Sequence, residues 1–144
     1  MIAAELIGTA TARKDGLCSR FMRVVFHEDM SGKGVVKLNI IGSYGYAYLE
    51  AVAYDGGYNS RFAITVGTNM FSVSLTGGQH RNIVFKTEAG NTALYIAKED
   101  YNNWTLGMFL IGTSKPGFNV ETELVSKEDY EAVKPSLNEV TVSS

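Results

Sequence analysis

Histidine and cysteine are the side chains best suited to metal binding or nucleophilic catalysis, and this chain has few of them. His27, Glu28 and Asp29 are adjacent, but neighbouring side chains of a strand point to opposite faces and cannot converge on one metal ion. The sequence has no His-Glu-x-x-His motif, no Cys-x-x-Cys pair and no Asp-rich calcium loop. The single cysteine, Cys18, could act as a nucleophile only if His80 approached it in the fold. We therefore expect no metal ion, no cofactor and no catalytic residue.

Carboxylates are the remaining candidates for acid–base chemistry, since two of them facing a cleft can hydrolyse a glycosidic bond. Most of the acidic candidates fall in expected turns, where such residues are favoured for the turn itself. Only Glu50 lies within an apolar and aromatic strand. This pattern gives no positive reason to expect an enzyme. The candidates are Glu28, Asp29, Glu50, Asp55, Glu99 and Asp100.

Aromatic residues are concentrated in two segments. Alternate residues of a strand share a face, so Tyr44, Tyr46 and Tyr48 should form a row, which Tyr54 joins if the strand is unbroken. Three roles stay open for this row: filling the core, forming a subunit interface, where tyrosine is enriched, or stacking on sugar rings. The second segment has a composition common at carbohydrate contacts, although its two asparagines also suit a turn. Its residues are Tyr101, Asn102, Asn103 and Trp104.

Composition limits the classes to which the chain can belong. Its 144 residues suit a single domain, and 45% hydrophobic residues are enough to bury a core. The net charge is −2, from 13 basic and 15 acidic residues, which is unfavourable for neutralising nucleic-acid phosphates. No stretch has the roughly 18 apolar residues of a membrane span, and no signal peptide is recognisable. We therefore expect no nucleic-acid partner and no membrane insertion.

Alternation with a period of two dominates the chain up to residue 125. Short apolar segments of this kind are separated by turn signals every ~8–12 residues, which is typical of an antiparallel sandwich or barrel. The connections are too short for the helices that a parallel sheet requires. We therefore predict an all-β, antiparallel β-sandwich, with a jelly roll as one candidate form. The expected strands cover 21–27, 35–41, 44–54, 61–66, 70–75, 82–86, 92–97, 104–111 and 118–125.

The end of the chain has a different pattern. Ser126 followed by Asp129 resembles a capping box, and Pro135 should end the helix that it begins. The sequence therefore predicts one short helix over 127–134, followed by an extended piece over 140–142. The expected organisation is a β-sandwich domain over 1–125 and a helix with an extended tail over 126–144.

Six segments follow one another in a characteristic order. An opening strand ends in small polar residues, a second strand and a long Gly/Tyr strand follow, and later strands lead through an aromatic-Asn turn into a last apolar strand. These segments are 6–11, 19–26, 44–54, 61–66, 93–98 and 105–111. Over 1–125 this succession resembles the β-sandwich domains at the distal ends of tail fibres and related virion appendages of tailed bacteriophages. The resemblance implies a homotrimeric virion protein, assembled in the host cytoplasm, whose exposed loops contact a host surface glycan or protein.

The function expected from these observations is surface contact without chemistry. A tail-fibre-like subunit, a head fibre and a decoration subunit of a capsid or baseplate all fit, each with the chain itself and other virion proteins as partners. We expect the subunit interface on the face of Tyr44, Tyr46 and Tyr48 and on the strand 108–111, which is apolar on both faces and could be buried on both sides. The alternative is a monomeric, lectin-like carbohydrate-binding module that uses Tyr101 and Trp104.

Overall fold

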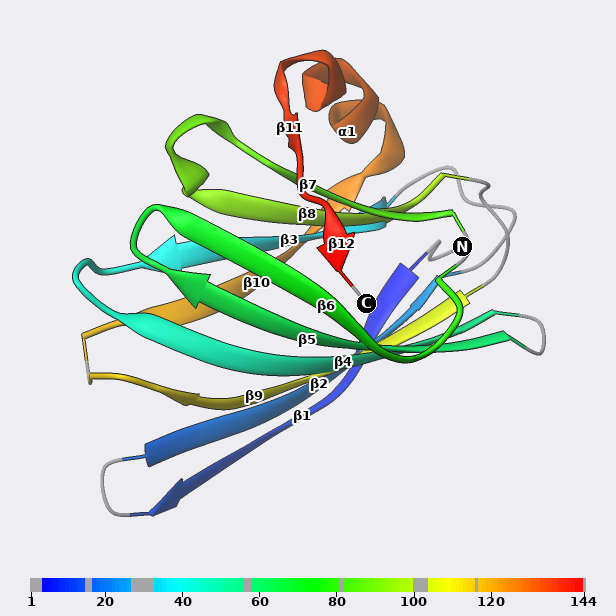
Figure 1. The fold of residues 1–144 in the computed structure, drawn as a ribbon. Coiled ribbons are helices and arrows are strands. Elements are labelled where there is room, and N and C mark those ends of the chain that lie inside the picture. The colour runs from blue at the N-terminus through cyan, green and yellow to red at the C-terminus, as the bar shows by residue number, and fades with distance from the viewer. Residues whose placement is uncertain are drawn as a thin grey trace.

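The computed structural model describes residues 4–14, 17–26, 33–55, 58–80, 82–99, 104–115 and 117–143. Of these, 4–14, 17–26, 33–34, 55 and 58 are described by their backbone alone. Over these ranges the chain forms two packed β-sheets and one short α-helix near the C-terminus (Figure 1). The predicted β-sandwich with a single C-terminal helix is therefore confirmed.

The larger sheet has seven strands within the described ranges, in the order β1-β2-β9-β4-β5-β6-β12. All its neighbouring strands are antiparallel except β12, which runs parallel to β6. Strands β4 and β9 lie in its middle, which places them far from either edge. Its strands are β1 (Ala4–Lys14), β2 (Leu17–Phe26), β4 (Tyr46–Asp55), β5 (Tyr58–Gly67), β6 (Met70–Gly78), β9 (Trp104–Thr113) and β12 (Val142–Ser143).

The smaller sheet has five strands within the same ranges, all antiparallel, in the order β10-β3-β8-β7-β11. The chain passes between the two sheets at β2–β3–β4 and again at β8–β9–β10, as it does in a jelly roll. The β4–β5–β6 meander stays within one sheet and departs from that pattern. The strands of this smaller sheet are β3 (Lys33–Ile41), β7 (Ile83–Thr87), β8 (Ala93–Lys98), β10 (Asn119–Ser126) and β11 (Asn138–Glu139).

The main core lies between the sheets and follows directly from strand alternation. In β4 the inward residues are small or aliphatic (Ala47, Leu49, Ala51 and Ala53), so the opposite sheet can approach closely. Phe62 of β5 meets Phe85 of β7 across the sandwich edge to face, with ring centroids 5.0 Å apart. Aromatic pairs of this geometry contribute roughly 0.5–1.5 kcal/mol beyond the area they bury. Further core residues include Val36, Leu38, Ile64, Leu94, Ile96, Leu106, Met108 and Leu110.

The helix α1 (Lys127–Val133) covers the outer face of the five-stranded sheet (Figure 1). The predicted cap is present, since the Ser126 hydroxyl accepts a hydrogen bond from the Asp129 backbone N–H at 3.0 Å. A 3₁₀ turn (Lys134–Ser136) that contains Pro135 ends the helix, one residue earlier than predicted. The buried Tyr130 packs with Val35, Tyr95 and Ala97 in a second, smaller apolar cluster. Within the described ranges, no helix is long and apolar enough to cross a membrane.

The last described residues, 137–143, form a C-terminal strap that joins the edges of the two sheets. Strand β11 pairs with β7, the Val140 backbone N–H donates to the Phe85 carbonyl at 2.8 Å, and β12 then pairs with β6. Val140 and Val142 pack against the main core. In Figure 1 the strap, drawn in red, descends from the five-stranded sheet to the edge of the seven-stranded one. It therefore closes one side of the sandwich.

Candidate interaction surface

Strand β4 presents a row of large side chains on the outer face of the seven-stranded sheet. Tyr46, Tyr48 and Tyr54 belong to this row and are between 36% and 61% exposed, and Val52 between them is exposed too. The predicted sharing of one face by these three tyrosines is therefore confirmed. Because the alanines and leucine between them fill the core, the first of the three proposed roles, core packing, is wrong for this row.

Tyr44 does not belong to the row, which corrects the sequence prediction. It lies in the connection between β3 and β4, before β4 begins at Tyr46, and its φ of 57° is in the left-handed region. Its side chain is 85% exposed and lies beside Lys115, whose Nζ is 5.7 Å from the ring centroid. A left-handed residue breaks the alternation that would have aligned it with the strand.

Strand β9 extends the apolar surface next to β4. Phe109, which is the register partner of Glu50, and Ile111 are both exposed, whereas Met108 and Leu110 are buried in the core. The expectation that this strand is buried on both sides is therefore wrong within one chain. Ile111 is the extra residue of a β-bulge opposite β4. The two predicted interface segments thus meet on one surface, the aromatic face, made of Tyr46, Tyr48, Val52, Tyr54, Phe109 and Ile111.

A groove of about 450 Å³ is sunk into this face between β4 and β9. Its middle is formed by Gly107, which is the register partner of Val52 and has no side chain to fill the space above it. Thr105 and Tyr54 line one end, and Glu50 and Phe109 line the other. We call it the Gly107 groove. Its volume is in the range of roughly 300–1,000 Å³ that is usual for sites that bind small groups.

Glu50 is the charged residue among the described residues that line the groove. Its register partners are Ala63 on β5 and Phe109 on β9, and neither can bond to a carboxylate. No hydrogen bond or ion pair connects Glu50 to another residue of the described chain. An exposed carboxylate is fully solvated in the free protein, but it would need a partner if this surface were covered.

Arg61 is a cation on the same sheet, on the strand next to β4. It is exposed on β5 opposite Val52, two positions along the strand from the partner of Glu50. Its side chain extends over Gly77 of β6, because a β-carbon added at Gly77 would lie 3.2 Å from its Nε atom. The guanidinium group therefore lies toward β6 and away from the groove.

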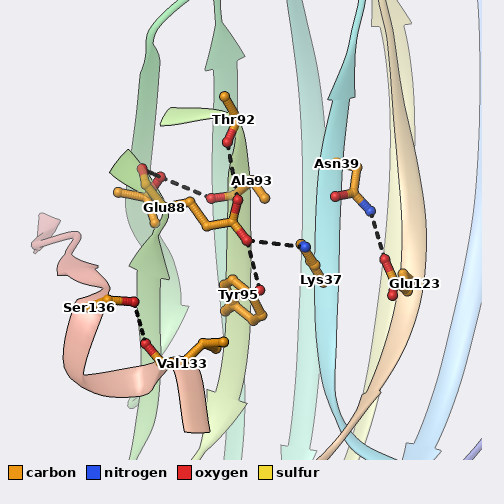
Figure 2. Close-up of polar contacts among 10 residues, drawn as sticks. Lys37, Asn39, Glu88, Thr92, Ala93, Tyr95, Glu123, Val133 and Ser136 are labelled. Atoms are coloured by element: carbon orange, nitrogen blue, oxygen red, sulfur yellow. Dashed lines mark hydrogen bonds and ion pairs between the residues drawn. The ribbon is translucent and has the colours of Figure 1, made fainter. Parts of the chain in front are cut away.

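A polar cluster occupies the outer face of the five-stranded sheet and is centred on Glu88 (Figure 2). Lys37 Nζ lies 3.1 Å from Glu88 Oε1, and the Tyr95 hydroxyl donates to the same oxygen at 2.8 Å. Thr92 donates to Glu88 Oε2 at 3.2 Å. The Lys37 ammonium also lies 5.3 Å from the centroid of the Tyr95 ring. The cluster ties the β7–β8 connection to β3 and β8.

The pKa directions show what this cluster does. Burial alone would raise the pKa of Glu88, but hydrogen bonds from Tyr95 and Lys37 outweigh burial and lower its pKa. Burial alone would lower the pKa of Lys37, but its contacts with Glu88 and Tyr95 raise that pKa. Burial and the bond to Glu88 raise the pKa of Tyr95. The pKa of each of the three groups moves away from neutral pH, whereas a general acid or base works best with a pKa near the operating pH. The cluster therefore acts as a structural clamp that holds the β7–β8 connection against β3 and β8.

A second ion pair fastens α1 to the same sheet. Lys134 Nζ lies 2.8 Å from Glu99 Oε2, and the Tyr130 hydroxyl donates to Glu99 Oε1 at 3.4 Å. The Tyr130 and Tyr95 rings are 5.9 Å apart, which connects this pair to the Glu88 cluster. Burial, followed by the charge of Glu99, raises the pKa of Tyr130. These contacts hold a helix against the five-stranded sheet, whereas no element of the described chain lies over the aromatic face.

The second aromatic segment is only partly described. Trp104 is 3% exposed and belongs to the main core, so it cannot stack on a sugar or line a subunit interface, and that prediction is wrong. It begins β9, where its position faces inward. Tyr101, Asn102 and Asn103 lie outside the described residues.

The candidate chemical groups do not come together where they are described. Glu50 lies on the outer face of the seven-stranded sheet, whereas Glu99 follows β8 of the other sheet and is engaged by Lys134. His80 is exposed, with its ring 6.4 Å from that of Phe62. Among the described residues, no group of three or more His, Cys, Asp or Glu side chains could hold a metal ion. The structure does not describe the side chain of Cys18 or residues 27–29 and 100.

Two residues of this surface, Gly107 and Arg61, were not predicted from the sequence. Gly107 interrupts an apolar strand, and an isolated glycine within a strand is a known sign of a bulge or a close approach, so a signal for the groove existed. Arg61 carries no comparable signal, because its position beside β4 depends on strand pairing.

Comparison with known proteins finds no matching family model, no matching curated protein and no matching solved structure. The resemblance to phage appendage domains therefore stays a prediction.

Proposed function

We propose that this protein is a non-enzymatic structural or adhesive subunit of a bacteriophage particle, working as a tail-fibre-like, head-fibre or decoration component. It acts by surface contact with other virion proteins or with a host receptor, and it self-associates, as a homotrimer, through the aromatic face. The observation that carries this proposal is the exposure of aromatic and aliphatic side chains on two central strands of the seven-stranded sheet.

An exposed apolar surface on the outer face of β4 and β9 indicates a site of interaction with a partner. The outer face of an antiparallel sheet is usually polar, because only its inner face contributes to the core. Here the outer positions of β4 and β9 instead carry Tyr46, Tyr48, Val52, Phe109 and Ile111. Contiguous apolar patches on soluble monomers are usually small, and larger ones mark sites of interaction. Tyrosine and phenylalanine are also enriched in interfaces.

Self-association explains such a face without requiring a second gene product. Homo-oligomers close through cyclic symmetry when one patch meets a complementary one. A trimer is the state that the resemblance to phage appendages implies. The opposite face of the sandwich is covered by α1 and the Glu88 cluster, which leaves the aromatic face as the available broad surface of the described sandwich.

The test is the mass in solution, measured by light scattering at two protein concentrations. We expect about three times the chain mass of 15.7 kDa. Tyr48→Ser should shift the protein toward the monomer, because it removes a central ring of the face. Tyr44→Ser is the matched control, since it makes the same change at an exposed tyrosine outside the face, and it should keep the wild-type mass. A wild-type monomer at both concentrations would contradict self-association.

A monomeric result would favour the second candidate, a carbohydrate-binding module. The burial of Trp104 removes the platform first expected for that function. The Gly107 groove supplies a different one, with Tyr54 and Phe109 beside the polar groups of Glu50 and Thr105. Sugar sites combine aromatic surface with hydrogen-bonding groups in this way.

A further inference from the structure

The Gly107 groove favours an occupant of one chemical type. Its lining is mostly apolar, formed by Val52, Tyr54 and Phe109 around the gap above Gly107, and one carboxylate, Glu50, stands at its end. An occupant that covers the groove and pairs with Glu50 would therefore combine an apolar stem with a cationic head. Arginine has this form, because its methylene stem packs on apolar surface and its planar guanidinium pairs with carboxylates and stacks on aromatic rings.

The same sheet presents such a side chain one strand away. Arg61 is exposed on β5, with its head over Gly77 of β6. Its position is diagonal to Glu50, because Glu50 pairs with Ala63 and Arg61 pairs with Val52. Diagonal positions of neighbouring strands are roughly 7–8 Å apart. No ion pair joins the two side chains, although both lie on the same surface of the described chain.

We propose that the Gly107 groove of one copy binds the Arg61 side chain of a second copy, whose guanidinium pairs with Glu50. The inference rests on the proposed self-association and specifies its central contact. One surface carries both the receptor and the group that fits it, and this complementarity favours a second copy over an unrelated basic protein. The surrounding rings of the aromatic face would exclude water from the pair, and exclusion of water is typical of the residues that dominate an interface.

The test is a reciprocal charge reversal. Glu50→Arg and Arg61→Glu are made separately, and the association of each variant is measured by sedimentation velocity. Each single variant should associate at least about tenfold more weakly than wild type, because like charges would meet in the interface. Glu121→Arg is the matched control, since Glu121 is exposed on β10 of the other sheet. It should associate like the wild type.

Mixing the two variants identifies the contact as one between copies. In an equimolar mixture, the Arg61 retained by the first variant can meet the Glu50 retained by the second. Two of the three contacts in a mixed trimer then join opposite charges, so association should recover in part. A pair within one chain cannot be restored by mixing, since each variant lacks one partner. Circular dichroism and thermal unfolding of each variant establish that it is folded.

The possible outcomes separate this inference from the function on which it rests. If the wild type is monomeric, self-association itself fails and the inference falls with it. If the wild type associates and the folded single variants associate equally well, the groove contact is overturned while self-association stands. If the single variants dissociate but the mixture does not recover, the pairing of Arg61 with Glu50 is overturned. Loss in both single variants with recovery in the mixture supports it.

Discussion

At the scale of single residues, the Glu88 cluster makes a prediction about pH. The pKa of Glu88 is lowered in the folded chain by its bonds to Tyr95 and Lys37. A lowered carboxyl pKa stabilises the fold above the unfolded value, and that stabilisation is lost as the pH falls through the folded value. We expect Glu88→Gln to lower the free energy of unfolding at pH 7 by about 1 kcal/mol. The deficit should begin to shrink below about pH 4.5, the ordinary value for this carboxyl, and should vanish below the lower folded pKa, where Glu88 is neutral in the folded wild type too.

Thermal unfolding from pH 3 to pH 7 measures this difference. Glu121→Gln is the control, because Glu121 is exposed on a strand of the same sheet, and surface changes of this kind usually stay within about 0.5 kcal/mol. A Glu88→Gln deficit that stays constant across the pH range would show that the charge of Glu88 does not support the clamp.

Strand alternation in the sequence predicts which residues share a face, but it does not predict which face is buried. In β4 one face carries Ala47, Leu49 and Ala51 and the other carries Tyr46 and Tyr48, and either set could have formed a core by hydrophobicity alone. Packing decides the matter, because small side chains allow the second sheet to approach closely. The role of the tyrosine row therefore could not be read before the two sheets were paired.

At the scale of elements, short-range signals in the sequence predicted the main strands and the helix. They could not predict which strands pair with each other. The cap at Ser126 and the stop at Pro135 are local, and both were predicted. The pairing of β9 with β4, which sets Phe109 beside Glu50, joins segments about two fifths of the chain apart. No periodicity within either strand encodes that register. The groove could therefore not be assembled from the sequence.

The C-terminal strap is short, but its removal should strongly lower the free energy of unfolding. It covers the edges of β6 and β7 and packs Val140 and Val142 on the core. Ending the chain after Leu137 should lower the free energy of unfolding by about 2–4 kcal/mol, since burial of one aliphatic side chain contributes roughly 1.5–3 kcal/mol when complete. The exposed strand edges should also promote aggregation.

Urea denaturation monitored by tryptophan fluorescence checks this prediction. Trp104 lies in the core and reports on its opening. If the shortened chain fails to fold, Val142→Ser offers a milder change in the same segment, with an expected loss of about 1 kcal/mol. Val133→Ser changes an exposed valine of α1 and should be nearly neutral. Equal stability of the wild type and the shortened chain would show that the strap does not close the sandwich.

At the scale of the whole molecule, the two broad surfaces of the sandwich are unlike. The outer face of the five-stranded sheet is covered by α1, Tyr130 and two ion-paired clusters. The outer face of the seven-stranded sheet exposes rings and aliphatic side chains around the Gly107 groove. Among the described residues, a helix packs on one of these faces and no element covers the other, so the uncovered face is the one available for assembly. Contacts between copies should therefore be confined to that side.

Hydroxyl-radical footprinting measured at protein concentrations below and above the association midpoint tests this confinement. Tyr46, Tyr48 and Phe109 are exposed on the aromatic face of a single chain, so radicals should modify them at low concentration and much less after assembly. Tyr44 is the internal control, because it is exposed in the β3–β4 connection and outside the face. Its modification should not change with concentration. Protection of Tyr44 together with the face would place the contact at the end of the sandwich, where its loops meet. Protection confined to α1 would assign assembly to the other sheet and would leave the aromatic face free for a ligand or a receptor.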